Sequence, residues 1–297
     1  MMIKPEFLDL IEFNEEEKQK YLELSPKIPL YMDEVAKQFV LEKRDPKEVA
    51  KEIADCAEKI GIHQYTVELI MSLWAGEYLE KEYEKAGLTR QLFIDAMKDM
   101  TYKMRECVKY HGIFGTTAHT VGWFNGWFHL NRLALGRLQY DTNITLEQDL
   151  ELCGIKLYEN TPCLGCHIPS SGKLTRELCI ESYKLAYKQF PEMLINGLLP
   201  IRCISWLLFT PYLPVFGEKG NTANFQRSFY IYNEGRYERF LHEMTVYGKR
   251  ITEPDLLMET SLQRNFKKYL DEVDVHGYGY GLLLFDGENI VTDRNPR

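Results

Sequence analysis

The sequence is informative first for what it lacks. No apolar run approaches the roughly 20 residues that a membrane-spanning helix needs. The first residues, M-M-I-K-P-E-F-L-D-L, carry acids where a signal peptide would have an uninterrupted apolar stretch. The 297 residues include 36 basic and 44 acidic side chains, so the net charge of -8 gives no electrostatic footprint for nucleic acid. We therefore expect a cytoplasmic protein that binds neither membranes nor nucleic acid.

The cysteines also indicate what to exclude. They number seven, an odd count spread along a long chain, which favours reduced thiols over a disulfide framework. The segment C-L-G-C-H at 163–167 has the spelling of c-type haem attachment. That chemistry is typical of exported proteins, and the sequence shows no export signal. Zinc would need a second ligand pair, and none of suitable spacing is apparent. We expect no haem and no metal, and interpret both cysteines as small apolar side chains of a buried strand.

The first 111 residues have the pattern of an acidic helical domain. Asn14, Pro46 and Thr89 stand where helices begin, and Gly61 stands where one ends. Between such signals, apolar residues recur at the spacing of one helix face. We expect a helical N-terminal domain at 1–111.

The composition changes across 111–122, a segment rich in glycine and nearly uncharged. Beyond it, short apolar runs typical of strands alternate with helical patterns. The expected strands lie at 133–140, 152–158, 164–168, 203–209, 240–247 and 278–285, and the expected helices at 175–189, 222–230 and 261–272. This mixture predicts an α+β chain, in which a mixed α/β layered domain at 115–297 follows the helical one.

The strand expected at 164–168 leads into a loop of small residues, P-S-S-G-K at 169–173, and Thr175 is placed to cap the next helix. Such a loop gathers unpaired backbone N–H groups at the positive end of a helix dipole, where phosphates bind. The alternative is a simple connection, and the spacing of a Walker loop is absent. The candidate phosphate contacts are Ser170, Ser171, Gly172 and Lys173.

Several segments, in order along the chain, resemble a known family. They are L-G-R-L-Q-Y at 135–140, H-I-P-S-S-G-K-L at 167–174, C-I-E-S-Y-K-L-A-Y-K-Q-F-P at 179–191, S-W-L-L at 205–208 and T-S-L-Q-R at 260–264. Together they resemble a family of bacterial acyltransferase-domain proteins with a helical N-terminal domain and a GNAT-like C-terminal domain. The resemblance covers most of the chain. It implies that acyl-CoA or acetyl-CoA is the co-substrate, that its pyrophosphate binds the loop at 170–173, and that the acyl group passes to an amine or hydroxyl of a small-molecule or peptide acceptor.

Acyl transfer to an amine needs a base for the nucleophile and donors for the tetrahedral oxyanion. His167 is the candidate base because imidazole titrates near neutral pH; the alternative is a core histidine on a buried strand. Tyr230 is a candidate acid for the departing thiolate. Arg137, between apolar leucines, is a candidate partner for a carboxylate or phosphate. Ser205 and Trp206 are candidates for the acceptor site, although a tryptophan there is also typical of a core.

A second hypothesis is a non-catalytic binding or scaffold protein that keeps the GNAT-like layers. The loop at 169–173 lacks the Q/R-x-x-G-x-G/A signature of GNAT pyrophosphate loops, and this departure favours the scaffold hypothesis. An opening between the strands that end near 168 and 205 would favour the enzyme.

Overall fold

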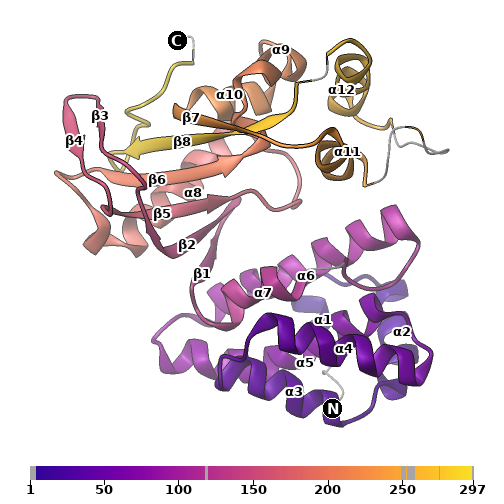
Figure 1. The fold of residues 1–297 in the computed structure, drawn as a ribbon. Helices are drawn as coiled ribbons and strands as arrows, with labels where there is room; N and C mark the ends of the chain where they lie inside the picture. The colour runs from indigo at the N-terminus through magenta and orange to yellow at the C-terminus, as the bar shows by residue number, and fades with distance from the viewer. Residues whose placement is uncertain (1–4, 118–119, 249–251, 253–257, 274, 296–297) are drawn as a thin grey trace. The chain divides into compact units, whose positions relative to one another are not determined.

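The computed structural model describes residues 5–117, 120–248, 252, 258–273 and 275–295. The chain divides into two compact units. Residues 1–134 and 169–171 form the first, and residues 135–168 and 172–297 form the second. The first unit is helical and the second is built on a mixed sheet (Figure 1). The expected fold class is therefore confirmed.

The helical unit extends beyond the boundary expected at 111–115, because a further helix follows it. Its elements are α1 (Pro5–Leu10), α2 (Glu15–Leu24), η1 (Ser25–Lys27), α3 (Tyr31–Leu41), α4 (Pro46–Ile60), α5 (Gln64–Lys85), α6 (Arg90–His111) and α7 (Thr120–Phe128). Of the segment expected to separate the domains, residues 118 and 119 lie outside the described part of the chain.

Helix ends in this unit follow the local sequence signals. Asn14 accepts a hydrogen bond from the Glu17 N–H at 2.9 Å, and the Glu17 carboxylate accepts one from the Asn14 N–H at 2.8 Å. This reciprocal pair satisfies two donors that a helix start leaves unpaired. Gly61 ends α4 in the left-handed conformation, with φ of 68°, which a glycine adopts without steric penalty.

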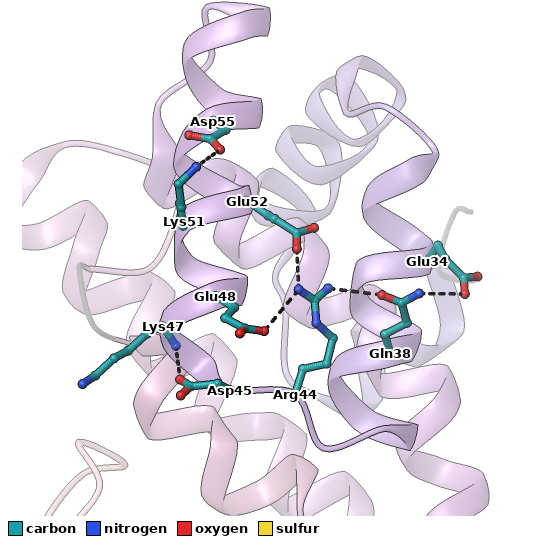
Figure 2. A network of polar contacts seen from close by, with 9 residues as sticks. All are labelled: Glu34, Gln38, Arg44, Asp45, Lys47, Glu48, Lys51, Glu52 and Asp55. Atoms are coloured by element: carbon teal, nitrogen blue, oxygen red, sulfur yellow. Dashed lines mark hydrogen bonds and ion pairs between the residues drawn. The ribbon is translucent and has the colours of Figure 1, made fainter.

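A polar network joins α3 to α4 at the surface (Figure 2). The Arg44 guanidinium lies 2.5 Å from the Glu52 carboxylate and 3.7 Å from that of Glu48, both on α4. It also donates to the Gln38 side chain on α3 at 3.1 Å. Because the guanidinium has donors fixed in one plane, it can bridge two helices where a lysine would contact one.

The first strand is β1 (Arg132–Leu135), of which only Leu135 lies in the second unit. The strands wholly within that unit are β2 (Leu138–Thr145), β3 (Leu150–Leu152), β4 (Ile155–Leu157), β5 (Pro162–His167), β6 (Leu199–Ser205), β7 (Tyr230–Arg236) and β8 (Gly277–Phe285). The main sheet has the order β1-β2-β5-β6-β8-β7, and β3 and β4 form a separate hairpin. The pairs β2–β5, β6–β8 and β7–β8 are antiparallel, whereas β5 and β6 run parallel. Helices α8 (Arg176–Gln189), α10 (Asn221–Arg227), α11 (Arg239–Tyr247) and α12 (Ser261–Glu272), with the short α9 (Leu213–Phe216), complete the unit.

Different elements cover the two faces of this sheet. On one face, the Ser182 hydroxyl of α8 contacts the Tyr140 hydroxyl of β2 at 2.9 Å. On the other face, leucines of the β3–β4 hairpin pack against Cys163 and Leu282. We name the first the helix face and the second the hairpin face. Strand residues that alternate along the chain point to opposite faces.

One expected strand is wrong. Residues 240–247 lie in helix α11, which Gly248 ends in the left-handed conformation with φ of 69°. A short apolar run has the same appearance in a buried strand and a buried helix, so periodicity cannot separate the two. Glu243 supports the helix, since its carboxylate pairs with Arg239 four residues earlier at 2.8 Å.

Four other expected elements have different bounds. The strand expected at 133–140 is divided by the turn at Gly136 and Arg137 into β1 and β2, and the strand expected at 152–158 spans the end of β3, a turn and β4. The helix expected at 222–230 ends at Arg227, and Tyr230 begins strand β7. The strand expected at 203–209 corresponds to β6, which ends at Ser205 and continues as the 3-10 helix η3 (Trp206–Leu208). The Ser205 hydroxyl accepts from the Leu207 N–H at 3.2 Å, a local bond that turns the chain out of the strand. Among the described helices, none is long and apolar enough to cross a bilayer.

Candidate functional site

Strands β5 and β6 lie side by side in the sheet for only part of their length. Their parallel register pairs Leu164 with Ile201 and Gly165 with Arg202. Beyond these positions β6 continues to pair with β8, through Ser205 opposite Gly279. On its other side, β5 pairs with β2 as far as His167. In the described chain the pairing of the two strands therefore stops before their carboxyl ends.

His167, the candidate base, is the last residue of β5 and faces a carboxylate. Its Nε2 lies 2.7 Å from Oδ2 of Asp141 on β2. The histidine side chain is 29% exposed and the aspartate side chain 17% exposed, so both are accessible from one side. A carboxylate accepts from Nε2–H, and this fixes the neutral tautomer that holds its acceptor lone pair on Nδ1. The pair has the arrangement of a general base and the residue that orients it.

Gly165 makes room for this pair. It lies opposite Asp141 in the β2–β5 register, two residues before His167 on the same face. A Cβ at Gly165 would lie 3.2 Å from the Asp141 Cβ and 2.9 Å from the Ile144 Cγ1. Any side chain there would displace Asp141 or the strand that carries it.

The haem-like spelling at 163–167 is divided between the two faces of the sheet. Cys163 packs into the hairpin-face cluster, whereas Cys166 pairs with Tyr140 in the β2–β5 register and lies on the helix face near Cys203 and Cys179. Burial raises the pKa of the Cys163 thiol to about 12 and that of Cys166 well above its ordinary value. Thiols on opposite faces cannot bond one porphyrin edge, and burial disfavours the thiolate that binds metals.

The loop after β5 is held by Arg137. The Arg137 Nε donates to the Lys173 carbonyl at 3.0 Å, and its Nη2 donates to the Gly172 carbonyl at 3.0 Å. Gly172 has φ of 112°, a conformation that residues with a side chain rarely adopt. Arg137 therefore contacts the backbone of the candidate phosphate loop.

The serines of this loop belong to the helical unit. Ser170 donates its hydroxyl to the Glu106 carboxylate, and Ser171 lies with it in a hollow beside Lys109 and Tyr110. Their expected role as phosphate contacts stays a prediction.

Helix α8 begins directly after the loop. The Thr175 hydroxyl accepts from the Leu178 N–H at 3.4 Å, as the capping signal predicts. Arg176, the first residue of α8, pairs with Asp293 at 2.5 Å and borders a cavity of about 560 Å³. The other residues that line this cavity are Glu218, Lys219, Asn224, Arg227, Asp293 and Asn295. Three cations line the cavity. Arg176 is paired with Asp293, and Arg227 donates to the Glu218 carbonyl at 2.6 Å. Within the described chain, the third cation, Lys219, has no ion pair.

The remaining candidates lie on other elements. Tyr230 is 41% exposed at the start of β7 and pairs with Leu282 of β8. Ser205 caps η3, and the Trp206 ring packs against Phe266 with centroids 5.5 Å apart. Trp206 thus belongs to an aromatic cluster, and its role toward an acceptor, like those of Tyr230 and Ser205, stays a prediction.

Asp141 is the site residue that sequence reasoning missed. The sequence placed it only next to a predicted strand. The strand predicted at 133–140 stopped one residue short of Asp141, and the pairing that brings it beside His167 depends on the long connection through the β3–β4 hairpin. The role of Arg137 was also missed, because nothing local in the sequence shows that its partners are backbone carbonyls.

Two family models match the chain. Residues 2–130 match the N-acyltransferase N-terminal domain, and residues 133–283 match the GNAT-like C-terminal domain. The second match covers just over half of the chain, so the protein belongs to the family with a GNAT-like C-terminal domain. The expected family is therefore confirmed. No curated protein sequence matches this chain.

Solved structures of acyltransferases share the fold. An acyltransferase mutant in complex with octanoyl-CoA has a TM-score of 0.70 at 15% identity, over 93% of this chain and 86% of that one. An acyltransferase in complex with decanoyl-CoA and teicoplanin has a TM-score of 0.62 at 15% identity, over 94% of this chain and 99% of that one. An acyltransferase in complex with decanoyl-CoA alone has a TM-score of 0.61 at 14% identity, over 95% of this chain and 99% of that one. The protein has the fold of these acyltransferases.

Proposed function

We propose that this protein is an acyl-CoA-dependent acyltransferase that moves an acyl group to an amine or hydroxyl of a small-molecule or peptide acceptor. The observation that carries the proposal is the end of the β5–β6 pairing beside the His167–Asp141 pair. Where the parallel pairing ends, backbone groups of the two strands become available to a pantetheine arm, and they lie next to a candidate base. The acyl-CoA complexes of structures with the same fold support this assignment.

The loop fits the pyrophosphate in chemical terms although it lacks the usual GNAT signature. Gly172 and Lys173 precede the N-terminus of α8, whose first N–H groups and dipole favour an anion. Lys173 adds a positive charge. The cavity that begins at Arg176 offers Lys219 for a further phosphate, so we assign the 3′-phosphoadenosine end of CoA to it.

In the proposed reaction, His167 takes the proton of the acceptor amine while the amine nitrogen attacks the thioester carbonyl carbon. Asp141 stabilises the imidazolium that forms. When the tetrahedral intermediate collapses, the carbon–sulfur bond breaks and the CoA thiolate leaves. The proton on His167 then passes to that thiolate, so charge and atoms balance.

The test is CoA binding and acyl transfer by the full chain. Calorimetry with CoA and octanoyl-CoA should show binding at micromolar to millimolar concentration, and a thiol reagent should detect CoA release when amine acceptors are added. His167→Ala should keep CoA affinity and lower turnover by about 10²–10⁴-fold. His63→Gln is a matched control, since that histidine lies in the helical unit, where its Nδ1 accepts from the Tyr65 N–H at 3.1 Å and its ring contacts the Tyr65 ring.

Absence of any CoA binding would sink the proposal. The non-catalytic scaffold hypothesis would then take its place, as the missing loop signature favours.

A further inference from the structure

Arg137 stands in the tight turn between β1 and β2, next to Gly136. Gly136 has φ of 69°, which lets the chain reverse in the space between the two strands. Arg137 is only 9% exposed. Its guanidinium is directed at the loop after β5, where it donates to two consecutive carbonyls, those of Gly172 and Lys173, each at 3.0 Å.

This contact fixes the direction of the loop's N–H groups. In a trans peptide unit the carbonyl and the N–H of the next residue point in opposite directions. When the Gly172 and Lys173 carbonyls both face the guanidinium, the N–H groups of Lys173 and Leu174 both face the opposite side. A guanidinium has donors and no acceptor, so it selects this orientation of the two peptide units over the reverse one.

The turn that carries Arg137 is itself anchored to α8. The Ser182 hydroxyl accepts from the Leu138 N–H at 3.2 Å, donates to the Leu135 carbonyl at 2.5 Å and contacts the Tyr140 hydroxyl at 2.9 Å. Ser182 is fully buried. The turn, the loop and the helix that starts after the loop are thus joined by hydrogen bonds on a single buried serine and a single buried arginine.

We propose that Arg137 is a positioning residue for the acyl-CoA site: it holds two loop carbonyls so that the N–H groups of Lys173 and Leu174 are presented together to the pyrophosphate. This inference rests on the proposed function, and it differs from a direct contact between Arg137 and the ligand. It explains how a loop without the GNAT glycine signature could bind an anion. The arginine would orient the loop N–H groups, which the signature does in other GNAT proteins.

The experiment compares Arg137→Ala and Arg137→Lys with the wild-type full chain. Calorimetry measures Kd for CoA and for inorganic pyrophosphate, and steady-state kinetics separates KM from kcat. We expect Arg137→Ala to raise Kd for both probes by about 10-fold to 100-fold, since it removes two charge-assisted hydrogen bonds that orient the loop. KM for acyl-CoA should rise, while kcat at saturation and KM for the acceptor change little. Arg137→Lys should restore little, because an ammonium lacks the planar fork.

Two readouts separate positioning from a general loss of structure. Added guanidinium ion at low millimolar concentration should recover CoA affinity in Arg137→Ala and leave the wild type unchanged. Arg264→Ala is the matched control, since Arg264 also donates to two consecutive carbonyls, those of Met258 and Glu259, at 2.8 and 3.1 Å. It should not alter CoA affinity.

The outcomes are distinguishable. If the wild type binds CoA and Arg137→Ala or Arg137→Lys binds it equally well, the positioning role is overturned and the proposed function stands. If the wild type binds neither CoA nor pyrophosphate, both fall. Loss of CoA affinity in Arg137→Ala with recovery by guanidinium supports the role, whereas an equal loss in Arg264→Ala contradicts it.

Discussion

Asp141 and His167 face each other across the β2–β5 pair, with Oδ2 and Nε2 2.7 Å apart, at the point where β5 loses its parallel neighbour. Asp141→Asn should preserve the geometry but replace a carboxylate, which only accepts, by an amide that can also donate to Nε2 of His167. That donor favours the His167 tautomer with its proton on Nδ1, which leaves Nδ1 without the lone pair that a base needs. We expect kcat to fall, by no more than the loss of about 10²–10⁴-fold that we expect for His167→Ala.

Steady-state kinetics with calorimetry checks this expectation. Asp149→Asn serves as the control, since among the described residues Asp149 accepts one hydrogen bond, from the Glu159 N–H at 2.8 Å. An Asp141→Asn enzyme with wild-type kcat would show that the pair is structural.

A second prediction concerns the glycine beneath this pair. Gly165→Ala should place a Cβ 2.9 Å from Ile144 and 3.2 Å from Asp141, closer than packed atoms tolerate. We expect a loss of about 1–3 kcal/mol in the free energy of unfolding, with a fall in kcat because Asp141 is displaced.

Gly122→Ala is the control for this change. Among the described residues, no atom lies within 4 Å of a Cβ at Gly122 on helix α7, so alanine should stabilise by about 0.5–1 kcal/mol. Denaturant unfolding measures both variants. Full activity in a stable Gly165→Ala protein would contradict the prediction.

The third prediction tests the cavity next to α8. Lys219→Ala should raise Kd for CoA by roughly 5-fold, equivalent to about 1 kcal/mol for an exposed charge pair. Affinity for 3′-dephospho-CoA should not change, because that ligand lacks the phosphate assigned to Lys219. Higher salt should narrow the difference. Lys188→Ala, at the opposite end of α8, is the control, and an equal effect on both ligands would exclude this cavity as the 3′-phosphate site.

The fourth prediction is a pH dependence of stability in the helical unit. Glu68 on α5 is only 6% exposed, and burial raises the pKa of its carboxyl from 4.5 to about 8. The folded state therefore keeps the proton that the unfolded chain releases. Stability from this group is greatest below pH 4.5 and is lost as the pH rises toward 8, by up to about 1.4 kcal/mol per pH unit.

Glu68→Gln removes the titration, so the variant should gain stability over the wild type at about pH 8 and much less at about pH 5. Denaturant unfolding followed by the helical circular dichroism signal gives both values. Glu77→Gln, at an exposed position of the same helix, should show no such pH-dependent difference. A gain that is equal at both pH values would rule out titration of Glu68 as the cause.

In the helical unit the helix starts at Asn14, Pro46 and Thr89 were predictable because their signals are local, whereas α7 was not predicted. Asn14 and Thr89 accept hydrogen bonds from N–H groups in the first turn that follows them, and Pro46 stands at a first-turn position where its missing N–H costs nothing, so a reader of the sequence can place them. The sheet was less predictable. Residues 240–247 form a helix although a strand was predicted. A short apolar run indicates that a segment is buried, but the type of element also depends on distant segments that pack against it.

The candidate site shows the same division. His167 and the loop before α8 were visible as a strand end and a helix start. Asp141 was not, because its relation to His167 is a register between strands separated by the β3–β4 hairpin. Arg137 could be predicted as a buried charge. Its partners are backbone carbonyls, and since every residue has one, the sequence does not show which carbonyls the arginine contacts.

The short contact between β5 and β6 has a mechanical consequence. On either side of it the sheet is antiparallel, with β2 and β5 on one side and β6, β8 and β7 on the other. The sheet is thus two antiparallel blocks joined along a seam whose register is Leu164 with Ile201 and Gly165 with Arg202. A ladder this short contributes few backbone hydrogen bonds between the blocks, so side-chain packing across the seam must hold them together. Cys163 of β5 and Leu282 of β8 belong to one buried cluster, and a smaller side chain at either position should therefore weaken the union of the two blocks as well as the core.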